Sequence, residues 1–313
     1  MTERSIQLSV LDLVPVFNQA DATIALGQAV ELAQTAERLG YSRYWVAEHH
    51  DMPGLACTST EVLLSHIGAR TQRIRIGSGA LLLPHYKPLK VAESFHMLAS
   101  LYPGRVDLGL GRAPGGAGEV SLALSGNFLE NVGKMPELLD GVSKLLQGKY
   151  KYDERPIAAR PTPPVPPDLW LLGTNKKSAA YAAEFGTGYV FGQFMSEVHG
   201  EEVLEAYRAA FIPSAHSTVS RAIVAVGVVC AETEEEARRL AASGTTLFRQ
   251  DDATAENGVS NRKLLVGTPQ SLKSKLEQLS LSYGVQEFII VTMIPDYGKR
   301  LRSYELLAEA CLF

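Results

Sequence analysis

The sequence has few cysteines, no long apolar run and no apolar leader. Its 313 residues include only 3 cysteines, Cys57, Cys230 and Cys311, and an odd number of widely separated thiols is typical of a reducing compartment. No window approaches the roughly 18 uninterrupted apolar residues that a membrane-spanning helix needs. Residues 1–5 lead directly into a strand-like segment without a signal core. These absences predict a cytoplasmic protein that does not enter a membrane.

Several functional motifs are also missing. The net charge is −4 and the chain has no basic cluster, which argues against nucleic-acid binding. No G-x-G-x-x-G turn follows the first predicted strand, so a dinucleotide-binding Rossmann domain is disfavoured. The sequence has no P-loop, no Ser-His-Asp constellation and no paired carboxylates. Nucleotide hydrolysis, acyl transfer and glycoside hydrolysis therefore lack support.

The sequence does contain a repeating pattern of strands and helices. Its 46% hydrophobic and 20% charged residues are typical of a soluble domain with a sizeable core. Strand-like segments occur at 6–13, 44–47, 74–79, 105–110, 169–173, 188–191, 222–229 and 287–292. Helices between successive strands imply parallel pairing with right-handed connections. Eight such units favour a single-domain α/β fold over residues 1–313, a (β/α)8 TIM barrel, rather than an open sheet.

Three segments between the strands need separate interpretation. One helix is expected over residues 129–146. The run at 160–167 (RPTPPVPP) is interpreted as a rigid approach to the next strand, with a ligand for a proline-binding module as the alternative. Residues 244–264, after the seventh strand, are polar and weakly periodic. Loops of this length are usually functional lids or disordered, so we predict a mobile lid or insertion loop there.

An arginine follows the fourth predicted strand. Residues 105–116 (RVDLGLGRAPGG) combine alternating apolar residues with a glycine-rich loop that contains Arg112. The planar donor fork of a guanidinium suits a phosphate or carboxylate. Active sites of α/β barrels lie at the C-terminal ends of the strands, where Arg112 is placed. A salt bridge from Arg112 to a neighbouring helix is the alternative interpretation.

The fifth predicted strand ends at a second candidate anion site. Residues 173–178 (GTNKKS) mark a strand-to-helix transition, where free backbone N–H groups and the helix dipole favour an anion. Thr174, Asn175 and Ser178 add short polar side chains. Lys176 and Lys177 would be mildly unfavourable at a helix start unless an anion offset them, although two solvated surface lysines are the simpler account. Together with Arg112 on the adjacent strand, this site predicts a bound phosphate.

Two histidines follow the second predicted strand. His49 and His50 are adjacent, so in an extended chain their side chains point to opposite sides. Further metal ligands at a suitable spacing are missing, and we predict no metal site. Because the ordinary pKa of histidine lies near neutrality, a proton-transfer role for one of them is favoured. The alternative is a histidine that hydrogen-bonds the backbone at the strand end.

Four motifs, in order along the chain, carry a family resemblance. They are 45–50 (WVAEHH), 77–84 (GSGALLLP), 104–112 (GRVDLGLGR) and 265–269 (LVGTP). Together they resemble the bacterial luciferase-like monooxygenase family, most closely its single-chain, flavin-dependent members outside the bioluminescent enzymes. The resemblance extends from the first strand to the eighth. It implies a (β/α)8 barrel with an insertion after the seventh strand, which suits residues 244–264.

The resemblance also implies a cofactor and a reaction. The cofactor would be reduced FMN, delivered by a separate flavin reductase, and molecular oxygen would be inserted into a small organic substrate. His49 would be the catalytic histidine beside the flavin. A non-prolyl cis peptide bond between Gly79 and Ala80 would lie against the flavin. The residues implied to hold the FMN phosphate are Arg112, Thr174, Asn175 and Ser178.

Two departures from the family pattern limit this interpretation. Gly111 replaces a reactive cysteine of luciferase, which argues against light emission, and Thr174 replaces a glutamate. Both leave the substrate open. A deazaflavin-dependent hydride-transfer enzyme of the same fold and a flavin-binding protein without turnover are the alternatives, although the retained His49 favours an enzyme.

Apolar side chains give less information than the motifs. The residues interpreted as barrel core rather than substrate recognition are Phe17, Trp170, Phe191, Phe194 and Met195. The resemblance implies a homodimer that pairs through helices flanking the early strands. An apolar stripe of Val62, Ile67 and Ala69 fits both an interface and a core.

Overall fold

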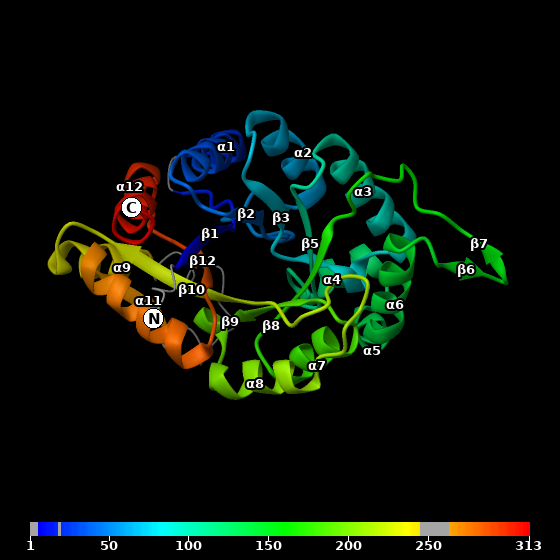
Figure 1. Cartoon of the computed structure of the whole chain (residues 1–313). Helices are drawn as coiled ribbons and strands as arrows, with labels where there is room; N and C mark the ends of the chain where they lie inside the picture. Colours follow the sequence, from blue (N-terminus) through cyan, green and yellow to red (C-terminus); the bar gives the residue numbers. More distant parts are fainter. Residues whose placement is uncertain (1–5, 18–19, 245–262) are drawn as a thin grey trace.

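The centre of the molecule is a closed barrel of parallel strands (Figure 1). A computed structural model describes residues 6–17, 20–244 and 263–313. The barrel strands are β1 Gln7–Asp12, β2 Arg43–Val46, β3 Arg75–Ser78, β5 Val106–Gly111, β8 Asp168–Gly173, β9 Gly188–Gly192, β10 Ala222–Cys230 and β12 Glu287–Val291. Each pairs in parallel with the next, and β12 pairs with β1. The predicted (β/α)8 barrel is therefore confirmed.

Helices surround the barrel (Figure 1). The outer helices are α1 Ala22–Arg38, α2 Thr60–Arg70, α3 Pro88–Leu101, α6 Met135–Leu146, α7 Lys176–Glu184, α8 Gly200–Ala210, α11 Pro269–Tyr283 and α12 Tyr297–Cys311. Each buries an apolar stripe, as α3 does with Val91, Phe95 and Leu98. The strands are covered on both faces, which explains their nearly continuous apolar sequences. Within the described ranges, no helix is both long and apolar enough to cross a membrane.

The connection from β5 to α6 is more elaborate than predicted. It contains α4 Gly118–Ser125 and α5 Phe128–Gly133, which lie beside the short β4 Leu81–Leu82 and the 3-10 turn η1 Leu83–His85. The single helix expected over 129–146 was wrong, because the chain leaves helical geometry at Lys134 between α5 and α6. Pro136 lies in the first turn of α6, where its missing N–H costs least, and it cannot continue the preceding helix.

The seventh barrel strand carries the predicted insertion. β10 pairs with β9 through its first residues and with β11 Leu264–Gly267 through its last. Between β10 and β11 the chain forms α9 Glu234–Gly244 and then continues through residues 245–262. The predicted lid at 244–264 falls largely on these residues, which lie outside the described part of the chain. An insertion after the seventh strand is confirmed.

A small hairpin interrupts the connection from α6 to β8. It consists of β6 Lys151–Tyr152 and β7 Arg155–Pro156 and projects away from the barrel (Figure 1). The proline-rich run that follows leads to the start of β8, as interpreted from the sequence.

Charged side chains close the N-terminal end of the barrel. Arg43 Nη1 lies 2.8 Å from Asp107 Oδ2, and Arg43 Nε lies 2.8 Å from Glu287 Oε1. Arg75 forms a second ion pair with Asp107. Burial alone would raise the pKa of Asp107, but the two guanidinium groups hold it below its usual value. These ion pairs occupy the N-terminal end of the barrel, opposite the C-terminal ends of the strands.

Candidate active site

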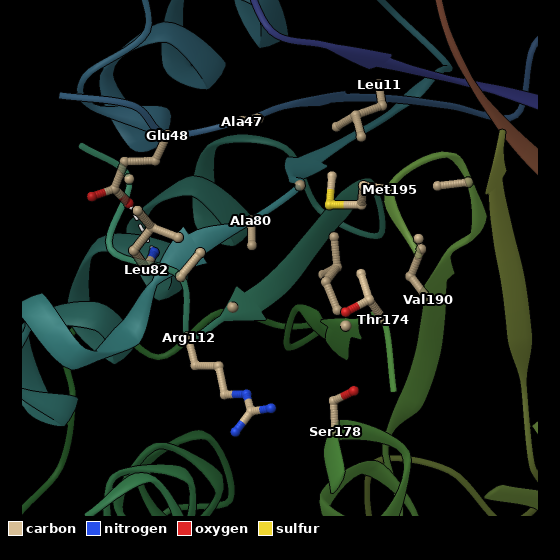
Figure 2. A pocket seen from close by; sticks show the side chains of 18 of the residues that line it. Leu11, Ala47, Glu48, Ala80, Leu82, Arg112, Thr174, Ser178, Val190 and Met195 are labelled. Carbon is tan, nitrogen blue, oxygen red and sulfur yellow. Dashed lines mark hydrogen bonds between the residues drawn. The ribbon is translucent and has the colours of Figure 1, made fainter. Parts of the chain in front are cut away.

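A cavity of about 400 Å³ opens at the C-terminal ends of the barrel strands (Figure 2). This volume lies within the range of roughly 300–1,000 Å³ that is typical of small-molecule sites. Residues of β1, β5, β8, β9 and β10 contribute to its lining, together with the loops that follow β2, β3, β5 and β8. All seven predicted site residues lie on this lining: His49, Gly79, Ala80, Arg112, Thr174, Asn175 and Ser178.

Arg112 provides a cation at one end of the cavity. It directly follows β5, and its Nη2 donates a long hydrogen bond of 3.4 Å to Asn175 Oδ1. None of the ion pairs found among the described residues includes Arg112. The salt-bridge alternative therefore receives no support in the described part of the chain. A guanidinium without a carboxylate partner in a cavity is suited to bind an anion.

The N-terminus of α7 lies beside Arg112. Asn175 caps the helix, and its Oδ1 accepts hydrogen bonds from the backbone N–H groups of Lys177 and Ser178 at 3.1 and 3.3 Å. The expectation of entirely free N–H groups was thus wrong for these two. Ser178 Oγ donates to the Asn175 carbonyl at 2.8 Å and lies 3.1 Å from Tyr189 Oη. The helix dipole and the nearby hydroxyls still favour an anion at this end.

Lys176 is directed away from this anion site. Its Nζ lies 2.7 Å from Glu202 Oε2 on the exposed surface. The simpler account of a solvated surface lysine therefore holds for Lys176. Gly173, just before the cap, allows the strand and helix to approach closely, because a Cβ there would lie 2.0 Å from Ser178 Oγ.

His49 presents an unpartnered nitrogen at the cavity. Its backbone N–H donates to the Cys57 carbonyl at 2.9 Å, whereas its buried Nδ1 has no hydrogen-bond partner among the described residues. Burial lowers the pKa of His49, and the neighbouring His50 lowers it further. The imidazole is therefore neutral at pH 7. A neutral, partly buried imidazole with a free nitrogen can exchange a proton with a bound molecule.

His50 faces a different group, as the alternation of side chains predicts. Its Nε2 lies 2.7 Å from Glu48 Oε1. Among the described residues, no group of three or more His, Cys, Asp or Glu side chains is arranged to hold a metal ion.

Glu48 is a site residue that the sequence analysis did not single out. Its side chain is buried, with the residue only 2% exposed. Oε2 accepts a 2.9 Å hydrogen bond from the backbone N–H of Leu82 (Figure 2), and Oε1 accepts one of 2.8 Å from Tyr86 Oη. The Glu48 N–H donates to the Ala80 carbonyl at 3.2 Å. A carboxylate at the end of an apolar strand was the signal that could have identified it.

Glu48 therefore holds the segment that contains the expected cis peptide bond. The bond between Gly79 and Ala80 is cis, as the family resemblance implied. Across the cavity floor, a Cβ at Gly111 would lie 2.8 Å from the Ala80 Cβ. Glycine at this position leaves room beside Ala80.

The opposite end of the cavity is apolar. Figure 2 places Leu11 and Met195 away from Arg112 and Ser178. The 3-10 turn η2 Gln193–Met195 follows β9 and supplies two side chains. The apolar residues at this end are Leu11, Leu13, Val190, Phe194, Met195 and Ala225.

The residues at this end differ in part from the interpretation of the apolar side chains as barrel core. Met195 was assigned to the barrel core, but it lines the cavity and is 58% exposed, whereas Phe194 is buried in the core as expected and also lines the cavity. Phe17, Trp170 and Phe191 are buried, as expected. Periodicity could not distinguish the two groups, because a residue just past a strand end can face either the core or the mouth.

The fold and the site define an α/β-barrel protein with a cavity at the C-terminal ends of its strands, and comparison with known proteins specifies its family. The model of the luciferase-like monooxygenase family matches residues 6–286. The chain belongs to this family, and by class the protein is a flavin-dependent monooxygenase. The uncharacterized protein YwcH of Bacillus subtilis (strain 168) is 41% identical, with 97% of this chain and 99% of YwcH covered. The N-acetyl-S-alkylcysteine monooxygenase of the same organism is 35% identical, with 98% of each chain covered.

Solved structures support the same fold. Apo-MsnO8 is 36% identical and superimposes with a TM-score of 0.89, covering 97% of this chain and 98% of MsnO8. The oxygenating constituent of 3,6-diketocamphane monooxygenase of Pseudomonas putida, in complex with FMN, is 20% identical with a TM-score of 0.74, and 98% of each chain is covered. An F420-dependent secondary alcohol dehydrogenase with an F420-acetone adduct is 16% identical with a TM-score of 0.72, covering 98% of this chain and 99% of the dehydrogenase. The last two similarities concern the fold alone.

The residues around the cavity fit a flavin mononucleotide. Arg112 offers a cation to a phosphate, and the mostly apolar walls suit an aromatic ring system. His49 lines the cavity, and its buried Nδ1 has no side-chain hydrogen-bond partner among the described residues. A buried polar atom without a partner is costly and often marks a ligand site.

Proposed function

We propose that the protein is an FMN-dependent monooxygenase that uses reduced FMN and molecular oxygen to oxygenate a small organic substrate. The observation that carries the proposal is Arg112, a guanidinium without a carboxylate partner among the described residues, at the polar end of the cavity beside α7. A relative of 35% identity that is named as a monooxygenase supports the reaction type.

In this proposal the polar end binds the phosphate. Arg112 neutralises its charge, and Thr174, Asn175 and Ser178 contribute hydrogen bonds near the positive end of α7. Asn175 also holds the Arg112 guanidinium in position through its Oδ1. Gly79 and Ala80 provide a backbone surface for the ring, which Glu48 fixes in place through its hydrogen bonds to Leu82 and Ala80.

The chemistry is shared between the cofactor and His49. Reduced FMN, when bound, supplies the electrons that activate oxygen. Burial lowers the pKa of His49 below its ordinary value, so the imidazole on the cavity lining is suited to accept or relay a proton as the substrate is oxygenated. The apolar lining keeps water away from the reacting atoms.

The proposal includes partners and an assembly. A separate flavin reductase supplies the reduced FMN, and the enzyme works in the cytoplasm as a homodimer. On α2, Val62 and Ala69 are exposed and available to an interface, whereas Ile67 is buried in the core. Light scattering after gel filtration should give twice the chain mass of 33.9 kDa. A monomer would contradict the proposed dimer without affecting the proposed reaction.

Two alternatives use the same cavity. The structural similarity to an F420-dependent dehydrogenase favours deazaflavin-dependent hydride transfer as the second candidate. The third is a flavin-binding protein without turnover, against which the neutral His49 at the cavity counts.

One pair of measurements separates these functions. Titrations with FMN and with a deazaflavin establish cofactor preference, and an anaerobic mixture of protein and reduced FMN is then mixed with oxygen in a stopped-flow instrument. We expect tighter binding of FMN and a rate of flavin reoxidation that differs from that of free flavin. Preference for the deazaflavin would support the second candidate. Reoxidation of the flavin at the rate of free flavin would contradict the proposed monooxygenase function.

A further inference from the structure

The apolar end of the cavity has a uniform chemistry. Its described lining consists of Leu11, Leu13, Val190, Phe194, Met195 and Ala225. They come from β1 and the residue just after it, from β9, from η2 and from β10. Figure 2 shows Leu11, Val190 and Met195 on the side of the cavity away from Arg112. None of them offers a charge or a side-chain hydrogen bond. A charged group placed there would lose its hydration without gaining a partner.

The charged residues elsewhere on the lining already have partners or proposed ligands. Among the described lining residues, Arg112 is the one cation and Glu48 the one carboxylate. Arg112 lies at the phosphate end. Both Glu48 oxygens accept hydrogen bonds, from Leu82 N and Tyr86 Oη, and Oε1 also faces His50. The burial of His49 keeps its imidazole neutral at pH 7. Neither an anionic nor a cationic substrate therefore finds a free counter-charge on the described lining.

From this we infer that the enzyme selects an uncharged, predominantly apolar substrate, whose apolar part packs against Leu11, Leu13, Val190 and Phe194. The inference rests on the proposed function, because the polar end must be taken by the cofactor phosphate. Met195 lies at the exposed rim of this end, and its flexible thioether can adapt to substrates of different shape.

A matched set of ligands tests this inference directly. Calorimetric titration of the FMN-saturated protein at pH 7.5 compares octan-1-ol, octanoate and octylammonium, which share one chain and differ in charge. We expect octan-1-ol to bind at least about tenfold more tightly than either ion, because only the ions must be desolvated without a partner. Equal or tighter binding of either ion, or no detectable binding of the alcohol, would overturn the inference.

A pair of variants locates the binding. Leu13→Lys introduces a cation at the half-buried rim of the apolar end, and should shift the ratio of octanoate to octan-1-ol affinity by about tenfold towards octanoate. Leu281→Lys is the matched control, on the exposed surface of α11 where Leu281 is 76% exposed, and should leave the ratio unchanged. An unchanged ratio in Leu13→Lys would show that the ligands bind elsewhere.

The two proposals fail in different ways. If FMN binds and is reoxidised as proposed but octanoate is preferred, only the substrate inference fails. If FMN does not bind in a separate titration of the same protein, the proposed function fails, and the substrate inference that rests on it fails with it.

Discussion

The side chain of Arg112 is the first residue to test, because it is the one cation on the described lining of the cavity. Arg112→Ala should weaken FMN binding by about 1.5–3 kcal/mol, the usual contribution of a hydrogen bond to a charged group. This corresponds to roughly 10- to 100-fold in Kd. Fluorescence titration measures the change. Arg155→Ala, on the exposed β6–β7 hairpin, is the control and should bind FMN normally. Unchanged affinity in Arg112→Ala would refute the phosphate site.

His49 makes a second prediction at the scale of a single residue. Burial disfavours its charged form, so its titration midpoint should lie below the value of about 6.5 for an exposed histidine. The unfolded chain then binds more protons than the folded one, and the free energy of unfolding falls as the pH drops below about 6.5. Two-dimensional NMR of the imidazole resonances, with His49→Gln for assignment, reports the midpoint. A midpoint at or above 6.5 would contradict the neutral His49 on which the proton transfer depends.

The sequence predicted the residues on the cavity lining where a polar or charged side chain comes directly after a predicted strand. His49, Arg112 and Asn175 were placed near one another because the C-terminal ends of parallel strands share one end of a barrel. Glu48 was passed over, because its role depends on Leu82 and Tyr86, which approach it only in the folded barrel. Met195 was wrongly assigned to the core for a similar reason, since the sequence does not show which side of a turn faces a cavity.

At the scale of one element, α7 combines a structural cap with the proposed phosphate site. Asn175→Ala removes the N-cap of α7 and should cost about 0.5–2 kcal/mol of stability. It should also weaken FMN binding, because Asn175 contacts Arg112. Asn127→Ala is the matched control: Asn127 caps α5, accepting a hydrogen bond from Glu130 N at 3.1 Å. Thermal unfolding and FMN titration of both variants separate the roles. Equal FMN affinities would mean that Asn175 acts as a cap alone.

The elements themselves were largely predictable, and the exceptions have local causes. All eight barrel strands were identified, because strands buried on both faces read as apolar runs. The helix expected over 129–146 divides into α5 and α6 at Lys134, since proline in the first turn of α6 starts a new helix. The two-residue strands β6 and β7 are too short to give a periodic signal.

At the scale of the whole molecule, the closed N-terminal end of the barrel determines the response to acid. The pKa of Asp107 is lowered in the folded state by Arg43 and Arg75, so its stabilising effect is present above its unfolded pKa of about 3.9. The effect is lost as the pH falls through the lower, folded-state value. Asp107→Asn should cost about 3–5 kcal/mol at pH 7, because Arg43 and Arg75 lose the fully buried carboxylate that they share.

Urea unfolding from pH 7 to pH 2 measures this dependence. The difference between the native protein and Asp107→Asn should shrink below about pH 4, where the carboxylate of the unfolded chain takes up a proton, and should vanish once the native carboxylate is protonated at its lower folded-state pKa. Asp168→Asn is the control, because the Asp168 carboxylate is partly exposed and its pairs with Arg75 and Arg221 are solvated. It should cost about 1 kcal/mol or less. An Asp107→Asn variant as stable as the Asp168→Asn control would contradict the role assigned to this network.

The two ends of the cavity are built by different strands, and this separation has a practical consequence. The polar end is carried by β5, β8 and the start of α7, whereas the apolar end belongs to β1, β9, η2 and β10. A combinatorial library confined to Leu11, Leu13, Phe194 and Met195 would therefore vary the shape of the second end while leaving every proposed phosphate ligand in place. The barrel is therefore suited to laboratory evolution of new oxygenation catalysts, because residues of the apolar end can be varied while the residues of the polar end stay unchanged.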